Sequence, residues 1–387
     1  MIDTVVIGLV VLPAAFGLYA YVGYPLLLYL AARGRRARAE RSAEGEHWPT
    51  VSIVLPAYNE ARAIGATIEN LLALDYPEDR LQILVVSDAS TDDTDAIAQS
   101  FSDRGVELYR LPERGGKTAA ENASRFLVRG EIVVNTDASV RVDRHALKPL
   151  VAAFRDPSVG IASGRDVSVG DQEDRNVGET RYVNYEMMIR DLETAAGGIV
   201  GASGCFFASR KDLHGTMVPQ ALSRDFAAPL VAREQGYRTV SVPAAVCYVP
   251  RTPSLGSEYR RKVRTMARGL DTLYFKRSLL NPFRYGAFAF KLLSHKLARW
   301  LVPPAAVLAL PALVALAVTY DWARWVIAAL TAVVVLALAG LTWRGRAAPP
   351  RIVAIPAYVV SSVAAGVHAW VKAVMRERSP IWEPTRR

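Results

Sequence analysis

Four long apolar runs lie near the two ends of the chain, and a block of mixed polar and apolar residues separates them. The first run extends from Val5 to Ala32 without a charged residue, and the others lie at Leu301–Tyr320, Trp325–Trp343 and Ile352–Val371. Each is about as long as the roughly 20 residues that a helix needs to cross a bilayer. Three such runs in a row favour membrane helices over buried core helices.

Basic residues follow the first run at positions 33, 35, 36, 38 and 41. A cleaved signal peptide is the alternative for this run, but its start lacks basic residues and its apolar part is too long. Lys and Arg beside a span mark the cytoplasmic side, which predicts a cytoplasmic central block. Much of the net charge of +10 lies beside apolar runs. It therefore indicates a lipid bilayer as partner rather than nucleic acid.

The central block alternates short apolar runs with helical patterns, which predicts an α/β domain with a mostly parallel sheet. Ligands of such sheets bind beyond the carboxyl ends of the strands. The predicted strands are Val51–Pro56, Leu81–Val86, Val106–Leu111 and Glu131–Asn135, and the predicted helices are Ile64–Leu74, Thr91–Phe101 and Thr118–Val128.

The domain boundaries follow from these patterns. Pro356, Ser361, Ser362 and His368 make the last apolar run the least lipid-like, so we expect it to enter the membrane without crossing and the tail to return to the cytoplasmic side. The predicted parts are an N-terminal transmembrane helix (1–33), a basic linker (34–48), the α/β domain (49–282, with a basic amphipathic part at 254–282), an interfacial helix (283–300), a membrane region with two to three spans (301–375) and a basic tail (376–387).

The residues after the first two strands carry the first functional signal. No G-x-G-x-x-G follows the first strand and no G-x-x-x-x-G-K-[ST] occurs, so neither nucleotide-binding motif applies. Instead, the first strand ends in Pro56-Ala57-Tyr58-Asn59-Glu60, and Asp88 follows the second. With these segments, the chain resembles the family-2 glycosyltransferases of GT-A (Rossmann-like) fold, and among them the membrane synthases related to cellulose, chitin, hyaluronan and poly-N-acetylglucosamine synthases.

The resemblance implies a site for a UDP-sugar donor. Pro56, Tyr58, Glu60 and Asp88 would hold the uridine, and Lys117 in Arg114-Gly115-Gly116-Lys117 would lie near the diphosphate. Glycine permits close approach of backbone to phosphate, and lysine supplies a mobile cation. Taken alone, each segment has a simpler interpretation, namely a helix start with Ser90 or Thr91 as N-cap and an ordinary Gly-Gly surface turn.

The fourth strand ends in Asn135-Thr136-Asp137-Ala138-Ser139, where the family usually has Asp-x-Asp. The resemblance implies that Asp137 binds Mg²⁺ or Mn²⁺ at the donor diphosphate. Because Ser139 replaces a carboxylate, water and phosphate oxygens have to supply most of the ligands.

The remaining motifs concern the acceptor and the leaving group. By the same resemblance, Gly201, Ser203, Gly204 and Cys205 would line the acceptor site, and Asp225 would be the catalytic base. In a second set, Arg261 and Arg264 would contact the diphosphate, although a basic stripe that also includes Arg268 could equally bind anionic headgroups, and Thr265 replaces the tryptophan of processive members.

These observations predict an inverting glycosyltransferase at the cytoplasmic membrane face that transfers a sugar from a UDP-sugar to a saccharide or lipid acceptor, as in polysaccharide synthesis for the cell envelope. A non-processive enzyme acting on a polyprenyl phosphate or another lipid is one alternative. A catalytically silent membrane protein that binds nucleotide sugar, or that serves as a subunit of an envelope-synthesis complex, is another. The retention of both Asp137 and Asp225 speaks against the silent protein.

Overall fold

The central part of the chain folds around a single eight-stranded mixed sheet in the computed structural model, which describes residues 2–33, 48–169, 177–250, 254–343 and 349–377. Its strand order is β3-β2-β1-β4-β7-β6-β8-β5. The strands are β1 Val51–Ala57, β2 Leu81–Ser87, β3 Val106–Arg110, β4 Ile132–Thr136, β5 Arg141–Val142, β6 Val159–Val169, β7 Phe206–Arg210 and β8 Arg238–Pro250.

The first four strands are parallel, because each connects to the next through a crossover. Every residue of β1 and β4 is buried, as expected for parallel strands with helices on both faces. The four strands and three helices predicted for this half are all present, with ends shifted by at most four residues. The predicted fold class is therefore confirmed.

The second half of the sheet reverses direction. β7 is antiparallel to both β4 and β6, whereas β6 and β8 run parallel. The sheet helices are α3 Ile64–Leu72, α4 Thr94–Gln99, α5 Lys117–Ser124, α6 Leu147–Ala152, α8 Lys211–His214 and α9 Arg224–Glu234, with short 3₁₀ turns at Glu78–Arg80, Ser102–Arg104 and Ala153–Arg155.

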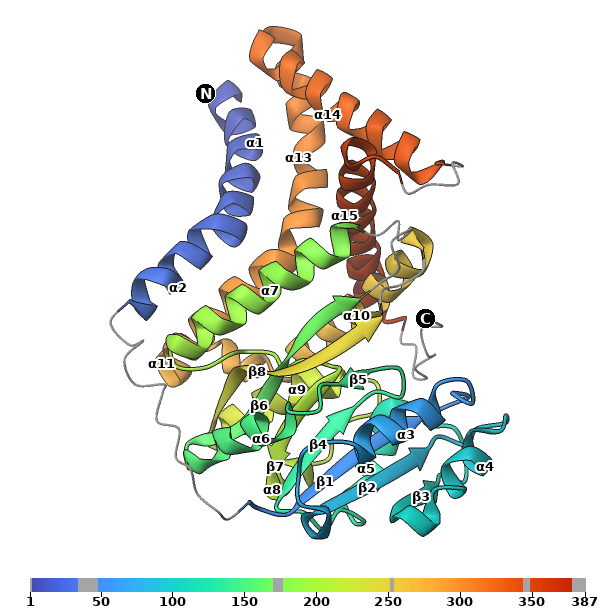
Figure 1. The fold of residues 1–387 in the computed structure, drawn as a ribbon. Coiled ribbons are helices and arrows are strands. Elements are labelled where there is room, and N and C mark those ends of the chain that lie inside the picture. Colours follow the sequence, from blue (N-terminus) through green and yellow to red (C-terminus); the bar gives the residue numbers. More distant parts are fainter. Residues whose placement is uncertain (1, 34–47, 170–176, 251–253, 344–348, 378–387) are drawn as a thin grey trace.

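Two longer helices, α7 (Val177–Ala195) and α10 (Leu255–Phe275), lie between the sheet and the apolar helices (Figure 1). Helix α10 lies in the basic amphipathic part of the predicted domain. It begins with a capping box in which the side chains of Ser254 and Ser257 each accept a backbone N–H.

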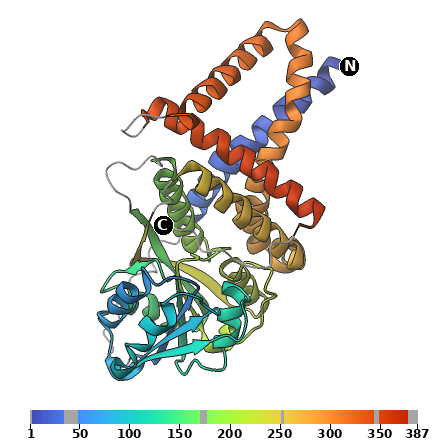
Figure 2. The same ribbon diagram turned by 90° about the vertical axis from the view of Figure 1, so that its right-hand side faces the viewer.

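Four helices among the described residues are long and apolar enough to cross a membrane: Thr4–Ala32, Ala287–Thr319, Asp321–Leu341 and Arg351–Met375. They extend from the same side of the sheet domain (Figures 1 and 2). The proposed boundary at residue 300 is not a break, because one helix runs through it. The elements are α1 Ile2–Leu18, a π-helical turn Tyr19–Gly23, α2 Tyr24–Ala32, a 3₁₀ turn Arg277–Leu280, α11 Pro282–Tyr285, α12 Ala287–Lys291, a π-helical segment Leu292–Ala298, α13 Arg299–Thr319, α14 Asp321–Leu341 and α15 Arg351–Met375.

A buried charged cluster joins α7 to the apolar helices. His295 lies between two carboxylates of α7, 2.9 Å from Glu186 and 2.8 Å from Glu193. Arg299 also binds Glu186, at 2.9 Å, and the hydroxyl of Tyr24 donates to Glu193. Burial opposes ionisation of both carboxylates, but the surrounding cations outweigh it and hold the pKa values of Glu186 and Glu193 below their usual range. These contacts dock the sheet domain onto α2 and α13.

The polar residues of the last apolar helix have partners on α10. Lys262 donates to Ser362 at 2.5 Å and its ammonium lies 3.6 Å from the centre of the Tyr358 ring, while Tyr259 hydrogen-bonds His368. The polarity of this segment thus reflects packing against α10 rather than a break in the helix. Whether it crosses the membrane stays a prediction, and the tail beyond residue 377 lies outside the described residues.

Candidate active site

The loops after β1 and β2 are joined by hydrogen bonds at the carboxyl edge of the sheet. Asn59, in a left-handed conformation, accepts from the Thr91 N–H at 2.8 Å. The Glu60 N–H donates to the Thr94 hydroxyl at 2.8 Å. Pro56 is buried in β1, and the ring of Tyr58 lies under the Arg114 guanidinium, 3.8 Å from it. The predicted donor residues of these two loops therefore lie next to each other.

Asp88 binds the Gly-Gly loop, so the segment that follows β2 does more than begin a helix. Its carboxylate accepts from the N–H groups of Gly115 at 2.7 Å and Gly116 at 2.8 Å. Burial raises the pKa of Asp88, and these two N–H groups oppose that rise. Helix α4 begins only at Thr94, with Asp93 rather than Ser90 or Thr91 at its N-cap. Asp88 therefore shapes the loop that precedes Lys117.

Lys117 connects three parts of the site. Its ammonium donates to the Asp137 carboxylate at 2.5 Å and to the Gly204 carbonyl at 2.9 Å. Burial favours the neutral amine, but Asp137 and Glu121 outweigh it and raise the pKa of Lys117 above its ordinary value. Lys117 is thus a fixed cation at the carboxyl end of β4, next to the loop that precedes β7.

The predicted acceptor residues form a tight loop beside this cation. Ser203 is fully buried; its hydroxyl donates to Asp166 at 2.5 Å and accepts the N–H of Cys205 at 3.0 Å. The Ser203 hydroxyl therefore stabilises the turn and does not point toward the open side of the loop. A methyl group added to Gly201 would lie 3.1 Å from the Lys296 side chain, so this loop also contacts the segment that enters the apolar helices.

Asp225 lies on the other side of the same loop, in the first turn of α9. A methyl group on Gly204 would lie 2.9 Å from its Oδ2, and the Ser223 hydroxyl donates to its Oδ1 at 2.5 Å. Lys117, Gly204 and Asp225 thus lie together.

The basic stripe of α10 divides among different partners. Arg261 binds Glu258 through Nε at 2.8 Å, whereas Arg268 donates to the Leu222 carbonyl at 2.5 Å and to the Thr118 hydroxyl at 3.1 Å. Arg264 is half-buried between them. Arg268, which sequence reasoning assigned only to the stripe, reaches the helix of Lys117.

The carboxylate predicted to bind a divalent cation, that of Asp137, follows β4 at this edge of the sheet and is held by Lys117. Over the described ranges, no group of three or more His, Cys, Asp or Glu side chains is placed to hold a metal ion. Both cysteines, Cys205 and Cys247, are free thiols. A single carboxylate suits Mg²⁺ or Mn²⁺ only when diphosphate oxygens and water complete the coordination.

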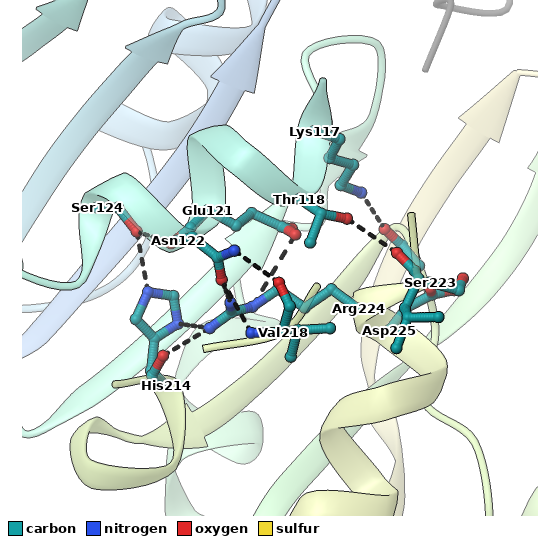
Figure 3. A network of polar contacts seen from close by, with 12 residues as sticks. Lys117, Thr118, Glu121, Asn122, Ser124, His214, Val218, Ser223, Arg224 and Asp225 are labelled. Carbon is teal, nitrogen blue, oxygen red and sulfur yellow. Dashed lines mark hydrogen bonds and ion pairs between the residues drawn. The ribbon is translucent and has the colours of Figure 1, made fainter. Parts of the chain in front are cut away.

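A buried polar network behind Lys117 and Asp225 was not predicted (Figure 3). Arg224 donates to Asn122 Oδ1 at 2.7 Å and to the His214 carbonyl at 2.6 Å, with the Glu121 carboxylate 4.0 Å away. Burial lowers the pKa of Arg224 and of His214 and raises that of Glu121. The spacing of Lys117 and Glu121, four residues apart on one helix face, could have indicated this network.

The arrangement offers what displacement at a phosphorylated carbon requires. A fixed cation, Lys117, and a carboxylate that could accept a proton, that of Asp225, lie beside the same Gly204 loop.

Comparison with known proteins agrees with this description. The chain is 26% identical over 235 residues to the poly-beta-1,6-N-acetyl-D-glucosamine synthase of Staphylococcus aureus (strain COL), a match that covers 58% of this chain and 55% of that protein. It is 27% identical over 242 residues to the probable glycosyltransferase YdaM of Bacillus subtilis (strain 168), covering 59% and 57%. The chain thus spans little more than half the length of these relatives.

Among solved structures, the fold is similar to that of the mannosyltransferase PcManGT from Pyrobaculum calidifontis in complex with GDP-Man and Mn2+. The TM-score is 0.72 at 24% identity, over 98% of this chain and all of that one, so the likeness includes the apolar helices. The profile of glycosyl transferase family 2 matches residues 52–216, which contain the first four strands except Val51, together with Asp88, Lys117 and Asp137. The chain therefore carries a glycosyl transferase family 2 domain.

Proposed function

We propose that this protein is a membrane-bound inverting glycosyltransferase that transfers a sugar from a nucleotide diphosphate donor to a saccharide or lipid acceptor. The observation that carries the proposal is the meeting of Lys117 and Asp137, within the region that matches glycosyl transferase family 2, with Asp225 around the Gly204 loop. The relatives support it, since one is named a polysaccharide synthase and a structural neighbour was solved with GDP-Man.

In the proposed reaction, the Asp225 carboxylate accepts the proton of an acceptor hydroxyl as that oxygen attacks the anomeric carbon. The new bond forms on the face opposite the departing diphosphate, so the anomeric configuration inverts. The bond between the anomeric carbon and the diphosphate oxygen breaks, and the negative charge passes to the nucleoside diphosphate. Lys117 would stabilise that charge, because a fixed donor in a partly buried site needs little reorganisation.

Asp137 would hold a divalent cation together with the donor diphosphate. Such a cation supplies further neutralisation of the leaving group when it is bound. Lys117 binds the same carboxylate, so lysine and metal would share Asp137.

The membrane helices supply the proposed location. Arg33 follows the first apolar helix, which favours a cytoplasmic face for the sheet domain. Helices α7 and α10 lie between this domain and the apolar helices, so an acceptor attached to a lipid could approach from the membrane.

The test is to incubate the detergent-purified full chain with panels of UDP-sugars and GDP-sugars, with and without Mn²⁺, and to follow nucleotide release and product size. We expect release with at least one donor and loss of turnover in Asp225→Asn, with nucleotide binding retained. Turnover of Asp225→Asn near that of the wild type would refute the assignment of the base.

Product size separates processive synthesis from a single addition. Arg261 is held by Glu258, and Thr265 stands where processive members have tryptophan, which favours addition of one sugar. A long polymer in the product would exclude the addition of a single sugar, which is the second candidate function.

A further inference from the structure

Helices α5 and α9 carry the two groups that the proposed reaction needs. Lys117 begins α5 on the donor side, and Asp225 lies in the first turn of α9 on the acceptor side. Transfer requires these groups at a fixed separation, because a misplacement of about 1 Å in reacting groups can lower the rate by about 10²-fold. The contacts that join the two helices should therefore matter for catalysis.

Arg224 makes the central contact between them. It precedes the base in sequence, but its side chain points away from Asp225 and toward α5 (Figure 3). It is 5% exposed, so it is shielded from a substrate in the site. Its guanidinium is held at both ends, by Asn122 Oδ1 at 2.7 Å and by the His214 carbonyl at 2.6 Å.

The hydrogen-bond directions in this network are mutually consistent. The Arg224 guanidinium can only donate, so the His214 Nδ1 that lies 3.4 Å from it accepts, and His214 Nε2 carries the proton. That Nε2 then donates to the Ser124 hydroxyl at 2.9 Å, and Ser124 donates to the Glu121 carbonyl at 2.7 Å. The contacts run from α9 through α8 back to α5 without a conflict of donors.

Glu121 completes the charge balance on α5. It is 1% exposed, neither carboxylate oxygen has a hydrogen-bond partner in the described chain, and Arg224 Nε lies 4.0 Å from its Oε2. It lies one helical turn after Lys117. A buried carboxylate without hydrogen bonds is unfavourable on its own, so its position depends on these two cations.

We propose that Arg224 is a positioning residue, which together with Glu121 locks α9 to α5 and so fixes the base Asp225 relative to Lys117. This role rests on the proposed function, since it assigns no chemistry to Arg224 itself. A purely structural role would affect folding and leave the turnover of the folded enzyme unchanged.

The test uses the full chain in detergent with the donor and acceptor that give turnover. The variants are Arg224→Met, which removes the charge and the hydrogen bonds, Arg224→Lys, which keeps the charge, and the double variant Arg224→Met with Glu121→Gln. The matched control is Glu234→Gln, which breaks the 2.5 Å ion pair with Lys276 at the far end of α9.

We expect Arg224→Met to lower kcat about 30- to 100-fold while the donor KM stays within about threefold, by the sensitivity of catalysis to misplacement. Arg224→Lys should recover part of this loss, and the control should keep the wild-type kcat. The double variant should recover thermal stability, because it leaves no unpaired buried charge, without recovering kcat. The acid limb of the pH–rate profile should keep its midpoint while its plateau falls.

Two outcomes would overturn the inference. One is a kcat of Arg224→Met within about threefold of the wild type, and the other is a kcat that returns in parallel with stability in the double variant. Hydrogen exchange tests the same point without turnover: protection of the first turn of α9 should fall in Arg224→Met and not in Glu234→Gln, and equal protection would also overturn it. Failure of the proposed function would give a different result, namely no transfer by the wild type from any donor, or full turnover by Asp225→Asn.

Discussion

Substitution of Gly204 by alanine should separate the activity of this protein from its stability. The added methyl carbon would lie 2.9 Å from Asp225 Oδ2, whereas a comfortable non-bonded contact is about 3.5 Å. The difference of about 0.6 Å falls on the end of a side chain rather than on backbone. The carboxylate of the base should therefore move, and the fold should not.

The expected loss of activity follows from this displacement. A shift of about 0.6 Å in the base should lower kcat roughly 10- to 100-fold, because about 1 Å can cost 10²-fold. The backbone φ of Gly204 is not positive, so alanine introduces no backbone strain at this position. The free energy of unfolding should therefore change by less than about 1 kcal/mol. Lys117 binds the backbone carbonyl of Gly204, which the substitution leaves in place, so donor binding should persist.

The assay compares kcat, donor KM and thermal unfolding of Gly204→Ala with those of Gly256→Ala. A methyl group at Gly256, in the first turn of α10, would meet its nearest neighbour at 3.8 Å and should leave all three unchanged. If Gly204→Ala keeps more than half of the wild-type kcat while folding normally, the carboxylate of Asp225 is not the group whose position limits turnover.

Two further predictions concern metal and pH. Because the described residues offer no cluster of three or more ligands around Asp137, Mn²⁺ should bind weakly alone and more tightly with nucleoside diphosphate in calorimetry; equal affinities with and without nucleotide would contradict this. The depressed pKa values of Glu186 and Glu193 stabilise the fold above the ordinary glutamate pKa of about 4.3, and this contribution should disappear as pH falls through the folded values. Thermal unfolding followed downward from pH 6 should show that loss, and Glu193→Gln should weaken the pH dependence of stability. A Glu193→Gln variant with the same pH dependence as the wild type would refute this prediction.

The first half of the sheet could be predicted from sequence for a physical reason. Parallel strands with both faces buried are mostly apolar, so β1, β2 and β4 read as apolar runs with few polar residues, and Tyr58, Asp88 and Asp137 follow their ends. Because such strand ends share one edge of the sheet, the positions of the donor residues directly after the strands were enough to predict that they lie close together.

Individual contacts within the site could not be predicted in this way. The assignment of Asp88 to the donor was made without the Gly-Gly loop that its carboxylate binds, and Ser203 was assigned to the acceptor although its hydroxyl is buried in its own turn. Both are short polar side chains whose partners lie 27 and 37 residues away in sequence. Such pairings depend on how loops from different strands meet, which no local pattern records.

Helix α7 shows the limit most clearly, because its buried face is charged. Glu186, Arg190 and Glu193 recur every three or four residues and are each less than 10% exposed, yet on hydropathy alone they mark the solvent side of a helix. The two glutamates are buried because His295 and Arg299 approach from a helix about a hundred residues later, whereas Arg190 donates to the Ala202 carbonyl. A buried carboxylate is tolerated only when such partners are present, so α7 and the apolar helices depend on each other for their places. The sequence pattern of α7 alone contains the carboxylates but not their cationic partners. Those partners lie on the apolar helices, and they allow this polar face of α7 to be buried.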